Sequence, residues 1–191
     1  MQELLSTVEN STDSIIYALD ETYIRNESNN YKSWSSKGQA PAIERNGSHK
    51  GLNMVGATEI SSQFDSIVDC YSYDVSIDSS KIIVFLERLL DKNENKKIFV
   101  ILDNAKNHKS KAINEFVKNH TDRLELIYLP PYSPQLNPQE NIWNKIKRSL
   151  FKLRSRVCID ELFVNLASFM EKFNLNIAQI KSIAYGKNYY Y

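Results

Sequence analysis

The chain has 191 residues, of which 42% are hydrophobic and 25% charged, and it contains five glycines. This composition is typical of one folded domain and excludes collagen-like, low-complexity and intrinsically disordered chains. No uninterrupted apolar run exceeds five residues, whereas a helix needs about 20 to span a bilayer. We therefore expect no membrane partner. Since no export signal follows Met1, we expect a cytoplasmic location.

The net charge of +1 hides an asymmetry along the chain. Residues 1–80 hold 12 acidic and 5 basic side chains, whereas residues 81–191 hold 11 acidic and 19 basic ones. The densest basic stretch, residues 144–156, carries six Lys or Arg side chains and no acidic one. An ordinary solvated surface mixes signs, so this stretch favours contact with a polyanion, although Lys-rich helices also serve solubility.

The hydrophobic pattern predicts an α/β fold. Three strands are expected first, joined as an antiparallel meander, over residues 14–20, 52–60 and 64–71. Helices and parallel strands then alternate, with a helix over about 82–90, a strand at 97–103, a helix over about 108–119 and a strand at 124–129. This alternation implies a right-handed crossover within one mixed sheet, flanked by helices.

The remaining chain is expected to pack on the same sheet. Four of the five prolines lie in residues 130–138, which predicts a stiff loop that fixes where the next helix begins, near Pro138. A last amphipathic helix is expected over about 159–173, and the tail 187–191 is expected to fray. We divide the chain into a lead-in (1–13), a main domain (14–155) and a helix and tail packed on that domain (156–191).

Three carboxylates are candidates for one site. Asp20 and Asp103 each end an apolar strand at the carboxyl edge of the sheet, where α/β proteins bind ligands. Glu140 lies in the first turn of the helix that the proline loop positions. Oxygen ligands from separate elements suit Mg²⁺, and three converging carboxylates can hold two ions about 3.5–4 Å apart. Each has a structural alternative, because a strand-end Asp often caps a turn and Asn137–Glu140 is also a helix-capping pattern.

Three sequence blocks resemble the signature blocks of DDE transposases of the mariner superfamily, in particular its bacterial insertion-sequence branch (insertion sequence 630 type). The blocks are Leu19–Thr22, Ile101–Lys109 and Leu129–Lys147, and residues 34–41 also match. The resemblance extends over about residues 14–152 and implies an RNase H-like fold for that domain. It also implies DNA strand cleavage and strand transfer in cut-and-paste transposition. The catalytic residues and metal ligands would then be Asp20, Asp103 and Glu140.

The resemblance carries further implications for cofactors and partners. It implies two Mg²⁺ or Mn²⁺ ions when DNA is bound, transposon-end and target double-stranded DNA as partners, a homodimer in the DNA complex and association with the bacterial nucleoid. Such transposases carry helix-turn-helix domains before the first catalytic strand, but only 13 residues precede Ser14 here. We therefore expect a separately encoded or frameshift-fused helix-turn-helix portion. The alternative is a catalytically silent remnant that only binds DNA or another transposase.

Several side chains are expected to contact DNA. Lys145, Arg148, Lys152 and Arg156 share a stripe at helical spacing, which suits contact with successive phosphates. Tyr132, in the proline loop, is a candidate for stacking on a base, with packing inside the protein as the alternative.

The signature blocks contain three other residues of interest. His108 follows the second Asp closely enough to touch a phosphate, with a capping or buried polar role as the alternative. Glu21 alternates to the side of its strand opposite Asp20, which favours a supporting role over direct metal binding. Trp143 lies on the same helix face as Glu140 and is expected in the core, where it would anchor the catalytic helix.

Overall fold

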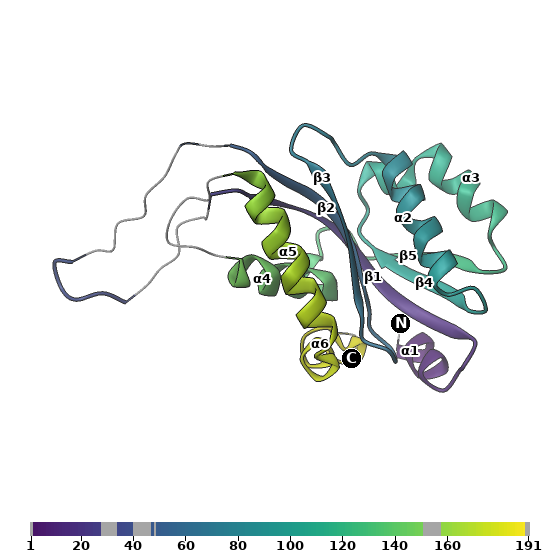
Figure 1. Cartoon of the computed structure of the whole chain (residues 1–191). Coiled ribbons are helices and arrows are strands. Elements are labelled where there is room, and N and C mark those ends of the chain that lie inside the picture. Colours follow the sequence, from purple (N-terminus) through teal and green to yellow (C-terminus); the bar gives the residue numbers. More distant parts are fainter. Residues whose placement is uncertain (1, 28–33, 40–46, 48, 151–157, 190–191) are drawn as a thin grey trace.

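The computed structural model describes residues 2–27, 34–39, 47, 49–150 and 158–189. Five strands form one sheet in the order β3-β2-β1-β4-β5 (Figure 1). Strands β1, β2 and β3 pair antiparallel, whereas β4 pairs parallel with β1 and with β5. The strands are β1 (Ser14–Arg25), β2 (Gly51–Glu59), β3 (Ser66–Ser72), β4 (Lys97–Leu102) and β5 (Leu124–Tyr128). The predicted mixed sheet is therefore confirmed.

Helices cover both faces of the sheet, and each face has its own hydrophobic core. On one face lie α2 (Ser79–Lys92) and α3 (Lys111–Asn119). The other face is covered by α1 (Gln2–Glu9), α4 (Pro138–Ser149), α5 (Ile159–Asn174) and α6 (Ile177–Ala184). Figure 1 shows α2 and α3 on one side of the strands and α4, α5 and α6 on the other. Within the described residues, no helix is long and apolar enough to cross a membrane.

Strand β1 is longer than predicted. Its parallel pairing with β4 stops at Ala18 opposite Ile101, but its antiparallel pairing with β2 continues to Arg25 opposite Gly51. Asp20 therefore lies inside the strand, and the prediction that the strand ends there is wrong. Alternation along β1 still holds, so Asp20 lies on the α4 face and its neighbour Glu21 on the α2 face.

The connection between β2 and β3 explains why β3 begins at Ser66 rather than Phe64. The carboxylate of Glu59 is fully buried and accepts hydrogen bonds from the backbone N–H groups of the four residues 61–64. Since a side chain already satisfies these donors, this segment does not need a strand partner.

Two short helices were not anticipated. Helix α1 lies in the expected lead-in, and its Leu5 and Val8 are buried in the core. Helix α6 follows α5 and buries Ile180 and Ala184. The tail is ordered as far as Tyr189, so the expected fraying is wrong for residues 187–189. The Tyr189 hydroxyl accepts from Asn141 Nδ2 at 2.6 Å and donates to the Ile183 carbonyl.

Two predicted helices also begin or end elsewhere. The helix expected from His108 begins at Lys111, because Ser110 caps it by accepting from the Ile113 N–H. His108 lies instead in a preceding 3-10 helix, Lys106–Lys109. The basic helix α4 ends at Ser149, and residues 151–157, which include Lys152 and Arg156, lie outside the described residues.

Candidate active site

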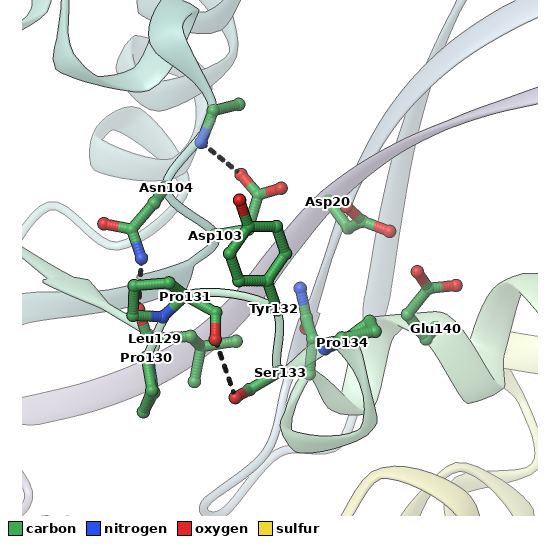
Figure 2. Close-up of a pocket in the computed structure, with 12 residues that line it drawn as sticks. Asp20, Asp103, Asn104, Leu129, Pro130, Pro131, Tyr132, Ser133, Pro134 and Glu140 are labelled. Atoms are coloured by element: carbon green, nitrogen blue, oxygen red, sulfur yellow. Dashed lines mark hydrogen bonds between the residues drawn. The ribbon is translucent and has the colours of Figure 1, made fainter.

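The three predicted carboxylates line one cavity of about 510 Å³ (Figure 2). Asp20 comes from the middle of β1, Asp103 follows β4 directly, and Glu140 lies in the first turn of α4. The proline loop supplies another wall, and Figure 2 shows the Tyr132 ring beside Asp103. Asp20 and Asp103 are 83 positions apart in the sequence, and Asp103 and Glu140 are 37 apart, yet all three line the same cavity.

Asp20 is held by a side chain of α4. The indole Nε1–H of Trp143 donates to Asp20 Oδ2 at 3.1 Å. Burial raises the pKa of Asp20 from 3.8 to about 7, and the nearby charges of Glu140, Glu21 and Asp103 add to the rise. A cation in the cavity would relieve both effects, because it favours the ionised carboxylate.

The position of Glu140 is set by the residues just before it. Asn137 caps α4 by accepting from the Gln139 N–H at 3.1 Å, and its Nδ2 donates to the Leu19 carbonyl at 3.0 Å. Gln139 is fully buried and accepts from the Thr58 hydroxyl at 2.7 Å. The first turn of α4 is therefore fastened to both β1 and β2. The predicted cap at Asn137 is confirmed, and it positions Glu140 rather than competing with a role in the site.

Gly56 on β2 has no side chain, which allows α4 to approach the sheet closely. A Cβ atom added at Gly56 would lie 2.4 Å from Trp143 Cη2, inside any normal contact distance. Trp143 is 1% exposed and belongs to the core of the α4 face. The prediction that Trp143 anchors the catalytic helix in the core is thus confirmed, and its contact with Asp20 adds a second role.

Asp103 is joined to Glu21 through a buried histidine. His108 has 0% exposure, its Nδ1 lies 2.9 Å from Asp103 Oδ1, and its Nε2 lies 2.8 Å from Glu21 Oε1. Burial lowers the pKa of His108, but the hydrogen bonds and charges of Glu21 and then Asp103 outweigh it, so the net shift is upward. The ring is not presented to solvent, so this geometry does not support the expected phosphate contact and agrees with the buried polar alternative.

The proline loop presents Tyr132 to solvent. Its side chain is 100% exposed, so the alternative of packing inside the protein is wrong. Its backbone φ of 57° lies in the left-handed region, which costs a non-glycine residue about 1–3 kcal/mol. The loop is tied to the end of β4 by a hydrogen bond from Asn104 Nδ2 to the Leu129 carbonyl. An exposed aromatic ring in a fixed, strained loop at the cavity mouth is available to a ligand.

Two of the predicted DNA-contacting cations line a second hollow. Lys145 and Arg148 lie on α4 and face a polar depression of about 670 Å³ whose far wall is formed by Ser182 of α6 and by Asn188. Asn141, the residue after Glu140, lines the depression, so both hollows border the first turns of α4. Its two cations suit a phosphate chain that continues away from the carboxylates.

The carboxylate cavity fits a hard divalent cation by its donor chemistry. It offers oxygen ligands from three elements, and a cation there would oppose the rise that burial and the neighbouring carboxylates cause in the pKa of Asp20. Among the described residues, however, no three His, Cys, Asp or Glu side chains stand close enough together to hold an ion. A bound ion would therefore need further ligands, such as phosphate oxygens and water.

A protein-family model covers most of the chain. The family model described as DDE superfamily endonuclease matches residues 15–163. No curated protein matches the sequence.

Solved structures are similar at low sequence identity. The mariner Mos1 paired-end complex with Mg has a TM-score of 0.65 and 16% identity, over 100% of this chain and 60% of that chain. The Mos1 transposase catalytic domain with raltegravir and Mg has a TM-score of 0.61 and 13% identity, over 100% of this chain and 92% of that one. A simian T-cell lymphotropic virus intasome in complex with PP2A regulatory subunit B56 gamma has a TM-score of 0.54 and 14% identity, over 82% of this chain and 48% of that chain. These likenesses confirm the predicted RNase H-like fold. This chain spans about 60% of the length of the protein chain in the Mos1 paired-end complex.

Proposed function

Because the chain belongs to the DDE superfamily endonucleases, we propose that it cuts DNA strands and transfers them to target DNA, with divalent cations held by Asp20, Asp103 and Glu140. The observation that carries this proposal is the convergence of these three carboxylates on one cavity. The chain is also similar to Mos1 complexes whose names include a left transposon end, Mg or Mn. This similarity supports DNA as substrate and Mg²⁺ or Mn²⁺ as cofactor.

The carboxylates are suited to different parts of this task. The charges of Glu140 and Asp103 both act on Asp20, so the three carboxylates would hold the cations together. Bound Mg²⁺ or Mn²⁺ would supply Lewis-acid activation of the attacking oxygen and stabilisation of the leaving oxygen. The protein contributes the placement, since Trp143 fixes Asp20 and the Asn137 cap fixes Glu140.

DNA is proposed to cross the cavity mouth and continue along α4. Tyr132 would stack on a base, and Lys145 and Arg148 would neutralise phosphates beyond the cut. Assignment to the bacterial insertion-sequence branch, a homodimer around DNA, a separately encoded helix-turn-helix portion and a bacterial nucleoid location stay predictions from the resemblance.

Nicking of supercoiled plasmid in Mn²⁺ tests the proposal. The variants Asp20→Asn, Asp103→Asn and Glu140→Gln keep side-chain size but remove one negative charge each, so each should abolish nicking. A variant that nicks at the wild-type rate would disprove the role of that residue.

The matched control is Asp122→Asn, which makes the same chemical change at an exposed turn before β5, at the opposite edge of the sheet. It should nick normally. A wild-type chain that binds plasmid but leaves it intact at every Mn²⁺ concentration would instead favour the silent DNA-binding remnant.

A further inference from the structure

His108 is the only buried histidine among the described residues, and it joins two carboxylates from separate strands. The ring Nε2 is hydrogen-bonded to Glu21 Oε1 at 2.8 Å, whereas Nδ1 is hydrogen-bonded to the Asp103 backbone carbonyl at 3.3 Å and also lies 2.9 Å from Asp103 Oδ1. Glu21 lies on β1 and faces away from Asp20, whereas Asp103 lines the carboxylate cavity. The imidazole therefore connects the cavity to the opposite face of the sheet.

The backbone around His108 holds the ring in place. The His108 carbonyl accepts from the Tyr128 hydroxyl at 2.8 Å, and the His108 N–H donates to the Ala105 carbonyl at 3.0 Å. The neighbouring Asn107 is bonded to the Ile77 carbonyl and to the Ser79 hydroxyl. With the turn fastened to β5 and to the start of α2, the ring has little freedom to leave Asp103.

The bonds to Asp103 differ between its two oxygens. Oδ1 accepts from the Ala105 N–H at 2.9 Å, and His108 Nδ1 lies 2.9 Å from the same oxygen. Figure 2 shows the second carboxylate oxygen directed to the side of Asp20. The Asp103 side chain is 54% exposed, so without these two contacts nothing among the described contacts would set its rotation.

We propose that His108 and Glu21 are positioning residues for the DNA-cleaving site, acting in series: Glu21 fixes the imidazole, and the imidazole turns Oδ2 of Asp103 toward the metal position. This inference rests on the proposed function. It replaces direct contact between His108 and DNA with an action through Asp103. Partners that orient a metal-binding side chain typically change metal affinity by about 10- to 100-fold when removed.

The test measures Mn²⁺ binding as well as cleavage, on the 191-residue chain. Electron paramagnetic resonance would give the Mn²⁺ half-saturation in the presence of plasmid DNA, and nicking would be followed over the same Mn²⁺ range. His108→Phe keeps a buried ring but removes both ring nitrogens and therefore their contacts with Glu21 and Asp103. Glu21→Ala leaves the imidazole without its anchor. The control, His120→Phe, makes the same change at a partly exposed histidine bonded to the Phe116 carbonyl.

We expect His108→Phe to raise the Mn²⁺ half-saturation by about 10- to 100-fold. This variant should recover nicking at high Mn²⁺, whereas Asp103→Asn should not. Glu21→Ala should also raise the half-saturation, and Glu21→Gln should raise it less because an acceptor for Nε2 remains, while His120→Phe should leave the half-saturation unchanged. Because Glu21 acts only through His108, the double variant should be no worse than His108→Phe alone.

Failure of this inference and failure of the proposed function give different results. If Asp103→Asn abolishes Mn²⁺ binding and nicking but folded His108→Phe keeps the wild-type half-saturation, the positioning role is wrong and the proposed function stands. Additive effects of Glu21→Ala and His108→Phe would also overturn the serial arrangement. If Asp103→Asn itself binds Mn²⁺ and nicks like the wild type, the proposed function is wrong and the positioning role with it.

Discussion

Replacing Asp20 by Asn should stabilise the folded protein increasingly as the pH rises. Burial and the charges of Glu140 and Glu21 raise the pKa of Asp20 from 3.8 to about 7 in the folded state. The folded protein therefore binds this proton more tightly than the unfolded chain does. Its contribution to stability is complete below the unfolded pKa and is lost progressively as the pH rises through the folded pKa.

The size of the effect follows from the same shift. Each pKa unit corresponds to about 1.4 kcal/mol, so ionising Asp20 costs the folded state about 4 kcal/mol once the pH exceeds 7. Between about pH 5 and pH 8 the loss amounts to about 2–3 kcal/mol, because part of it has already occurred at pH 5. The amide introduced by Asp20→Asn would be neutral throughout this range and would still offer an oxygen to the Trp143 indole. The variant should therefore gain up to this amount over the wild type.

Urea denaturation across this pH range, with EDTA present, measures the difference directly. The control is Asp122→Asn, which makes the same chemical change at an exposed side chain outside the cavity. Adding Mn²⁺ at pH 8 should stabilise the wild type more than Asp20→Asn, since the cation balances a charge that the variant lacks. A difference between Asp20→Asn and the wild type that stays flat from pH 5 to pH 8 would refute the reasoning.

Three further substitutions test other parts of the site. Gly56→Ala should lose about 1–3 kcal/mol of stability in urea denaturation, because its Cβ would meet Trp143, and Trp143→Phe should recover part of that loss; purely additive losses would contradict the contact. Tyr132→Gly should be at least as stable as the wild type by thermal melting, because glycine relieves the positive φ, yet it should bind single-stranded oligonucleotide less tightly than Tyr132→Phe; equal binding by the two variants would exclude stacking. The double variant Lys145→Gln/Arg148→Gln should lower the magnitude of the slope of log K against log salt for duplex DNA by about 1.8. The control Lys111→Gln/Lys118→Gln on α3 should leave the slope unchanged. The opposite ranking would show that DNA does not contact the α4 depression.

Much of the fold could be predicted because many of its helices and strands have a recognisable local sequence pattern. The apolar run of β4 and the buried stripe of α2 are visible in the sequence, and both lie where they were expected. The three carboxylates could be named from short blocks around them. Their meeting in one cavity agrees with that choice, although the catalytic role itself stays a prediction.

The missed features depend on partners that are distant in sequence. Asp20 lies inside a strand because β2 pairs with the second half of β1 as far as Gly51, and nothing in the local pattern specifies that partner. The burial of His108 depends on Glu21, which is 87 positions away. Helices α1 and α6 have eight residues each. Helices this short are marginal in isolation, so they form here because they pack on the core rather than because of their own sequence.

The supporting contacts of the three carboxylates divide into two groups with different consequences. Asp20 and Glu140 share α4, since Trp143 bonds the first and the helix carries the second. A small shift of α4 therefore changes both together. Close packing of Trp143 on Gly56, which lies opposite Asp20 on β2, sets the position of that helix. Asp103 is supported independently, from the other face of the sheet through His108. Damage at His108 should thus alter one proposed metal ligand and spare the other two, whereas damage at Gly56 should alter two and spare Asp103.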